Sequence, residues 1–213
     1  MTLILPDRPS RSQRKAKGSG HLRRAEILEA AERVFVEQGY EGATIRRIAD
    51  EVGLSSTALY MHFRDKGQIL DEICVGHFAA LNAINEALLA ETLDPVERVR
   101  RMLQGYIDFA YAHPNTYRLV FCTPAPAREA GEEDGAAKPI GARTFELFSE
   151  GVRRIGEAGR LRQADVAVAA QTSWAACHGV VSLLLTRPGF AWADRRVLRD
   201  TVLDVVFTGL TLP

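Results

Sequence analysis

Residues 44–63 read TIRRIADEVGLSSTALYMHF, and their pattern predicts a short helix that stops at a tight turn. Thr44 can cap this helix through its side-chain oxygen, and the inward-facing positions are Ile45, Ile48, Ala49 and Val52. Gly53 suits the left-handed backbone that often ends a helix, and Leu54 is an apolar residue in the turn. The chain is therefore expected to reverse direction at Gly53.

A second short helix is predicted directly after this turn. Ser55 can cap it, and Leu59 and Phe63 then face inward. A helix, a glycine turn, an apolar plug and a short capped helix together favour a helix-turn-helix. The outward face carries Ser56, Thr57, Tyr60 and Met61. Hydroxyl side chains can approach base edges and a tyrosine can reach phosphate, which fits DNA. From these residues alone, two short helices packed in an ordinary bundle remain an alternative.

The rest of the chain is patterned for helices and shows no convincing strand. Apolar residues recur at helical spacing from Leu22, and Gly39 supplies a stop. Asp65 followed by Gln68 is a capping-box pattern for a long helix from about 66 to 90. Further helices are expected at about 95–112, up to 122, and at about 140–158, 163–186 and 194–210. The sequence predicts an all-α fold of about nine helices.

Two segments are predicted to lack regular structure. Residues 1–20 are rich in Ser, Gly, Pro and basic residues, which predicts a disordered basic arm. Residues 123–139 are rich in Pro, Gly, Ala and Glu, which predicts a mobile loop. The formal net charge is zero, yet residues 1–70 hold 12 Lys and Arg against 9 Asp and Glu. The arm can therefore bind phosphate or be only a solvated tail.

The composition and motifs weigh against several classes of protein. Cys74, Cys122 and Cys177 are far apart and show no spacing of metal ligands, so neither a metal nor a cofactor is expected. No GxSxG elbow, phosphate loop or HExxH motif is present, so no catalytic residue is assigned. No apolar run approaches the roughly 20 residues of a membrane span, and no signal peptide is visible. A reducing cytoplasm and no membrane partner are expected.

Residues 22–70 resemble the DNA-binding domain of the TetR family. The sequence GYEGATIRRIADEVGLS at 39–55, followed by LYMHFRDK at 59–66, is similar to that family's signature. The resemblance implies a transcriptional regulator, most often a repressor that releases a palindromic operator when a small molecule binds. It divides the chain into a helix-turn-helix domain at 21–67 and a ligand-binding and dimerisation domain at 68–213. The residues implied in DNA contact are Thr44, Arg46, Ser55, Ser56, Thr57, Tyr60, His62 and Lys66. Among them, Thr44 and Lys66 would meet phosphate, each at the start of a helix.

The C-terminal part carries a second resemblance. Trp174, His178 and Gly179 are similar to the Trp-His-Gly pattern of one TetR subgroup. Trp174 and His178 are four residues apart, so they share one helix face. They can line a pocket or belong to the core. The full set of candidate ligand-binding residues is His77, Phe78, Tyr106, Phe109, Tyr117, Phe121, Phe145, Phe148, Trp174 and His178. This aromatic content favours an apolar or aromatic ligand.

The last two predicted helices carry more apolar residues than one buried face requires. Such stripes suit an antiparallel pair that packs against its dimer mate, although an intramolecular core also fits. The expected partners are therefore a double-stranded DNA operator, a small-molecule effector and a second copy of the chain. A regulator that responds to oxidant or metal through its cysteines, and an activator in place of a repressor, remain alternatives.

Overall fold

The computed structural model describes residues 20–122 and 136–212, and within these ranges the chain forms nine α-helices and no β-strand. The predicted all-α class is confirmed. The predicted arm lies, except for residue 20, outside the described residues, as does most of the predicted loop. The end of that loop prediction was wrong, because residues 137–139 already form the first turn of a helix.

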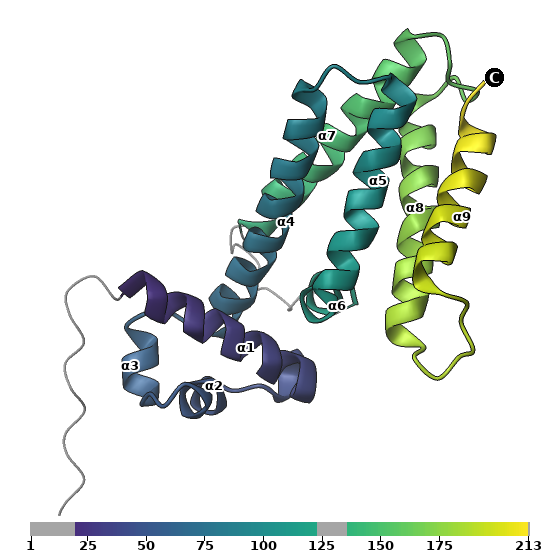
Figure 1. Cartoon of the computed structure of the whole chain (residues 1–213). Coiled ribbons are helices and arrows are strands. Elements are labelled where there is room, and N and C mark those ends of the chain that lie inside the picture. Colours follow the sequence, from purple (N-terminus) through teal and green to yellow (C-terminus); the bar gives the residue numbers. More distant parts are fainter. Residues whose placement is uncertain (1–19, 123–135, 213) are drawn as a thin grey trace, which may run out of the picture.

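Three helices at the N-terminal end form a small bundle (Figure 1). They are α1 (Gly20–Gly42), α2 (Ile45–Glu51) and α3 (Ser56–Tyr60). Their shared core has apolar side chains from all three helices and from the start of the next one: Ile27, Ala31, Val34, Phe35, Ile48, Ala49, Leu59, Phe63 and Ile69. Burying these side chains supplies the main stabilisation of a unit this small.

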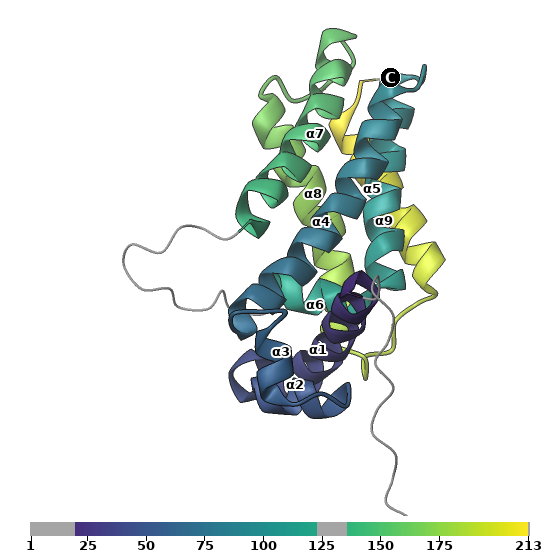
Figure 2. The same cartoon turned by 90° about the vertical axis from the view of Figure 1, so that its left-hand side faces the viewer.

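Six helices form the larger part of the molecule. They are α4 (Lys66–Ala90), α5 (Pro95–Ala112), α6 (Pro114–Cys122), α7 (Ala137–Glu157), α8 (Val166–Thr186) and α9 (Arg195–Leu210). Helix α4 packs on α1 near its start and on α5 and α7 farther along, so it belongs to both parts (Figures 1 and 2). Helices α8 and α9 lie side by side at the far edge of the bundle.

Aspartate residues set the starts of four of these helices. Asp65, Asp94, Asp165 and Asp194 each accept hydrogen bonds from backbone N–H groups in the first turn of α4, α5, α8 and α9. A capping carboxylate satisfies donors that the helix itself leaves unpaired and favours the positive end of the helix dipole. At α4, Gln68 also reaches back and accepts from the N–H of Arg64 at 2.7 Å, close to the predicted capping box.

Helices α4 and α8 are each long and apolar enough to cross a membrane by length and composition alone. Both are packed inside the bundle, α4 against α5, α6 and α7, and α8 against α5, α7 and α9. This packing accounts for part of their apolar character, since a core helix of a large bundle is apolar on several faces.

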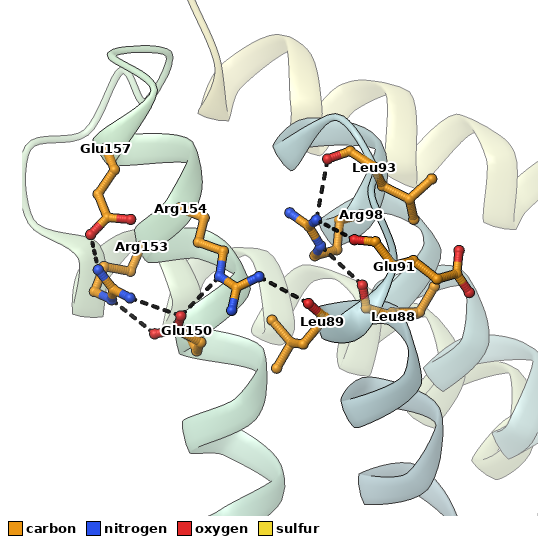
Figure 3. A network of polar contacts seen from close by, with 9 residues as sticks. All are labelled: Leu88, Leu89, Glu91, Leu93, Arg98, Glu150, Arg153, Arg154 and Glu157. Atoms are coloured by element: carbon orange, nitrogen blue, oxygen red, sulfur yellow. Dashed lines mark hydrogen bonds and ion pairs between the residues drawn. The ribbon is translucent and has the colours of Figure 1, made fainter.

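The end of α4 is held by two arginine side chains (Figure 3). Arg98 is only 5% exposed, and its guanidinium donates to three backbone carbonyls, those of Leu88, Glu91 and Leu93, at 2.9–3.2 Å. Arg154 of α7 donates to the carbonyl of Leu89 at 3.0 Å and is itself paired with Glu150. The bonds to Leu88, Leu89 and Glu91 satisfy carbonyls of the kind that every helix leaves unpaired at its C-terminus, and Leu93 lies just beyond the helix. We call this group of contacts the α4 clamp.

Candidate functional site

The α2–turn–α3 unit has the local geometry expected from the sequence. Thr44 has extended backbone and its hydroxyl accepts from the N–H of Arg47 at 3.2 Å. Gly53 has φ of 64°, a conformation that favours glycine. Ser55 caps α3 by accepting from the N–H of Ala58 at 3.1 Å. The two hydroxyls predicted to touch DNA are therefore also the caps that start the two helices.

The outward face of this unit is open to solvent. The side chain of Arg46 is 86% exposed, Tyr60 is 55% exposed and Met61 is 83% exposed. Thr57 is exposed beside them, while Ser56 is half-buried. Arg46 approaches Asp50 only at 4.0 Å, and an exposed ion pair of this kind contributes little stability. Its guanidinium is therefore available to an anionic partner at little cost to the fold.

Lys66 occupies a position that the sequence did not reveal. Its ammonium donates to the carbonyls of Tyr40 at 2.8 Å, Glu41 at 3.3 Å and Ala43 at 3.4 Å, and lies 4.4 Å from the centre of the Tyr40 ring. These carbonyls lie at the end of α1, where a cation is favourable. In this structure Lys66 joins α1 to α4, and its phosphate contact stays a prediction.

His62 lies between α3 and α4 and is half-buried. Its backbone carbonyl accepts from Arg24, whose guanidinium also pairs with Glu72 of α4 and lies 4.1 Å from the centre of the Phe63 ring. This contact set fixes the chain between the helix-turn-helix and α4. The predicted role of the imidazole at a DNA backbone is not tested by it.

A second candidate site is a cavity of about 400 Å³ within the larger bundle. Helices α4, α5, α7 and α8 form most of its wall, and α6 adds one ring. The lining residues are Phe78, Leu81, Asn85, Met102, Leu103, Tyr106, Phe121, Gly141, Thr144, Phe145, Phe148, Gln171 and Trp174. A mostly apolar cavity of this volume with a few polar groups is typical of small-molecule sites.

Six of the ten candidate ligand-binding residues line this cavity: Phe78, Tyr106, Phe121, Phe145, Phe148 and Trp174. The other four, His77, Phe109, Tyr117 and His178, lie behind the wall. Tyr117 is fully buried, and Phe109 stacks edge-on against His77 with ring centres 4.8 Å apart. Periodicity cannot separate these two groups, because a wall residue and a core residue both point inward from a helix.

Of the two alternatives, pocket wall or core, Trp174 takes the first and His178 the second. Trp174 forms part of the cavity wall, 5.9 Å from the ring of Phe145. His178 instead meets the hydroxyls of Tyr106 and Tyr117, each 2.8 Å from its Nδ1 atom. Burial lowers the pKa of His178, which favours a neutral ring whose Nδ1 can accept a hydrogen bond from a tyrosine hydroxyl. His178 therefore orients the hydroxyl of a wall residue from behind.

His77 is buried among aromatic rings on α4. It is 4% exposed, and neither ring nitrogen has a hydrogen-bond partner among the described residues. The rings of Phe78, Phe109 and Phe121 surround it edge-on, with centres 4.8–5.9 Å away. Burial, with a smaller contribution from the nearby His113, lowers the pKa of His77 to about 4. His77 is thus neutral at physiological pH.

Seven wall residues were missed from the sequence: Leu81, Asn85, Met102, Leu103, Gly141, Thr144 and Gln171. A usable signal existed on α4, because Phe78, Leu81 and Asn85 are spaced by three and four residues and so share one face. No feature of the sequence indicated that Gly141 would line the cavity. A Cβ there would lie 3.1 Å from the Phe78 ring, so glycine leaves room for that ring.

The described cysteines are poorly suited to sensing through a thiolate. Burial, assisted by the charge of Asp71, raises the pKa of Cys74 to about 11, and burial raises that of Cys177 to about 12. Within residues 20–122 and 136–212, no three His, Cys, Asp or Glu side chains cluster as metal ligands would.

Large apolar side chains are exposed along α8, α9 and the loop between them. They are Val168 at 44%, Leu183 at 49%, Phe190 at 63%, Val197 at 58% and Val205 at 66%. This many exposed large apolar side chains on two neighbouring helices favours a protein partner.

Two family models match the chain. The one described as "Bacterial regulatory proteins, tetR family" matches residues 27–73, and the one described as "Tetracyclin repressor-like, C-terminal domain" matches residues 99–206. The second match alone covers half of the chain.

Curated relatives match mainly over part of their length. The transcriptional activator FasR of Mycolicibacterium smegmatis is 34% identical over 99 residues, which are 46% of this chain and 45% of FasR. The transcriptional repressor AcnR of Corynebacterium diphtheriae is 40% identical over 99 residues, which are 45% of this chain and 44% of AcnR. The matched part of the chain thus spans about half the length of these relatives.

A solved structure matches nearly from end to end. The ketosteroid transcriptional regulator KstR2 of Mycobacterium tuberculosis has a TM-score of 0.71 and 25% sequence identity with this chain. The match covers 90% of this chain and 96% of that one, so both the small bundle and the larger bundle are shared.

Proposed function

Because this chain belongs to the TetR family of bacterial regulatory proteins, we propose that it is a DNA-binding transcriptional regulator that recognises an inverted-repeat operator. The observation that carries the proposal is the open α2–α3 face, where Arg46, Thr57 and Tyr60 are exposed on a rigid, capped unit. A short recognition helix with its N-terminal residues free is what the major groove accepts.

The proposal gives the exposed side chains two kinds of task. Thr57 and Ser56, at the start of α3, are placed to read base edges, whereas Arg46 and Tyr60 reach the backbone. The hydroxyls of Thr44 and Ser55 are held by helix caps, and each retains a lone pair for a donor or a proton for phosphate. His62 is proposed to complete the backbone contacts at the start of α4, where a phosphate contact of Lys66 would compete with its bonds to the carbonyls at the end of α1.

We propose a homodimer formed through α8 and α9. The exposed Leu183 and Val205, on neighbouring helices, support this arrangement, because two copies can bury the same apolar surface against each other. A dimer brings two recognition helices to half-sites about one helical turn, or a multiple, apart. The cytoplasm, where DNA is accessible, is the proposed location.

The cavity in the larger bundle is proposed to hold the effector. Its position against α4, the helix that leads into the helix-turn-helix, supports a coupling between ligand and DNA. We propose that the chain is a repressor that the ligand releases from DNA, because the relative AcnR is named a repressor. The alternative is an activator, because the relative FasR is named one. We propose that Trp174, His178 and Gly179 place the chain in the Trp-His-Gly subgroup, and Trp174 is the one of the three that lines this cavity. The raised thiol pKa values give the redox alternative no support.

The test begins with selection of binding sites from randomised duplexes by the purified full-length protein. An enriched inverted repeat, protected symmetrically in footprinting and bound by two chains, is expected. Arg46→Ala should weaken all duplexes equally, whereas Thr57→Ala should change the preferred bases. Absence of any enriched motif would contradict DNA recognition, and enrichment of a single asymmetric half-site bound by one chain would contradict the dimer.

A further inference from the structure

Asn85 is a buried polar side chain that faces the cavity without a partner. It is 7% exposed, it lines the cavity, and its carboxamide makes no hydrogen bond with any residue that the structure describes. A buried amide left unpaired is unfavourable unless a ligand or water satisfies it. Asn85 therefore marks a point in the wall where a polar group of a ligand would be stabilised.

The other polar wall residues differ from Asn85. Thr144 donates its hydroxyl to the carbonyl of Ile140 at 3.0 Å, and the Tyr106 hydroxyl lies 2.8 Å from His178 Nδ1. Gln171 is exposed and lines the cavity, which places it at the mouth. Among the described wall residues, Asn85 is thus a buried polar residue whose carboxamide has no protein partner and faces the space of the cavity.

The cavity wall also lacks formal charge. None of its described lining residues is Asp, Glu, Lys or Arg. A carboxylate or ammonium inside it would lose its hydration without gaining a counter-ion, which is strongly unfavourable. The remaining wall is made of aromatic rings and aliphatic side chains, which favour an apolar body.

We propose that the cavity binds an uncharged, largely apolar molecule with one hydrogen-bonding group, an amide or a hydroxyl, and that Asn85 binds this group. The inference rests on the proposed function of the cavity and adds the class of ligand and the residue that selects it. A carboxamide offers two donors and one acceptor oxygen, so it pairs well with a group that both donates and accepts. Because Asn85 lies on α4, this contact ties the ligand to the helix that enters the helix-turn-helix.

The first test compares two probes of the same shape, naphthalene-2-carboxamide and naphthalene-2-carboxylate. Titration calorimetry with the full-length protein at pH 7.5 should give at least tenfold tighter binding of the carboxamide, because the carboxylate alone must be buried with its charge. Equal or tighter binding of the carboxylate, or no binding of the carboxamide, would overturn the proposal. This comparison uses the unaltered protein and does not depend on any variant.

The second test uses a matched pair of variants on one helix. Asn85→Leu should weaken carboxamide binding by about three- to tenfold, the value of one hydrogen bond. Asn82→Leu, also on α4, serves as the control. Asn82 is buried and donates to the carbonyl of Ile140, and it does not line the cavity, so affinity should stay within about twofold. Equal effects of the two substitutions would show that Asn85 does not select the ligand.

These measurements use free protein, so they separate the two proposals. Carboxamide selectivity through Asn85 in a protein that binds no DNA motif would leave the ligand class standing and remove the regulatory function. A protein that binds its operator but takes carboxylate and carboxamide equally would keep the function and lose this inference.

Discussion

Replacing Lys66 by Met separates a structural role from a DNA contact. The substitution keeps the aliphatic stem and removes an ammonium that donates to three carbonyls at the end of α1, at 2.8, 3.3 and 3.4 Å. A hydrogen bond to a charged group contributes about 1.5–3 kcal/mol, and the two longer contacts add little to the first. With the side chain 27% exposed, we expect a total loss of about 1.5–3 kcal/mol.

That loss converts into a measurable change of melting temperature. For a chain of 150–250 residues, 1 kcal/mol corresponds to about 2–4 °C, so Lys66→Met should lower Tm by about 3–12 °C. The slope of log affinity for DNA against log salt should stay unchanged if the ammonium remains on α1 in the complex. Arg46→Ala is the matched control, because its exposed side chain should leave Tm unchanged and reduce the slope by about 0.9 per contact.

The opposite pattern would refute this reasoning. If Lys66→Met melted like the unaltered protein and lowered the salt slope by about 1.8 per dimer, the ammonium would be neutralising phosphate, as the family resemblance implies. Thermal melts without DNA and salt titrations with DNA, made on the same preparations, distinguish the two results.

Three further results are expected. Leu183→Glu combined with Val205→Glu should convert dimer to monomer in light scattering with little change in helicity, and a persistent dimer would contradict the α8–α9 interface. Gly141→Val should push the Phe78 ring, 3.1 Å from the added Cβ, into the cavity and reduce the affinity for naphthalene-2-carboxamide at least tenfold in calorimetry. Unchanged affinity would show that the probe does not bind in this cavity. Because the pKa of His77 is lowered in the folded state, the unfolded chain binds this proton more readily. The free energy of unfolding should therefore fall by about 3 kcal/mol as the pH is lowered from 6.5 toward 4. His77→Phe should flatten that part of the denaturation profile, and an equally steep profile would assign the loss to other groups.

The helix-turn-helix was predictable nearly residue by residue. Its helix starts depend on local chemistry: Thr44 and Ser55 each cap the backbone N–H three residues on, and Gly53 takes a positive φ. Such signals lie within four residues of sequence and need no tertiary information. The same holds for Asp94 at the start of α5. Local caps therefore predicted the starts of α2, α3, α4 and α5, whereas the cap of α8 at Asp165 was missed.

The cavity was predictable only in part, because its position depends on packing between distant helices. Phe121 and Tyr117 are four residues apart on one helix, yet Phe121 lines the cavity and Tyr117 is fully buried behind it. Their common spacing gives no means of separating them. Asn85 was missed because a polar residue on an apolar helix face normally marks its boundary with solvent. The sequence predicted only a DNA contact for Lys66, because the carbonyls that its ammonium meets become neighbours only when α1 packs beside α4.

The α4 clamp makes the two ends of that helix unequal. Arg98 and Arg154 fasten its C-terminus to the larger bundle, while its N-terminus packs on α1 of the small bundle. A rigid helix of this length, about 37 Å, would act as a lever, and a tilt of only about 5° at the fastened end would displace the other end by about 3 Å. The cavity lies along the arm of this lever, so a small displacement of the wall at Phe78 or Leu81 is enlarged before it reaches Lys66. In the proposed dimer the two displacements would add, and the distance between the recognition helices would change by more than either cavity wall had moved.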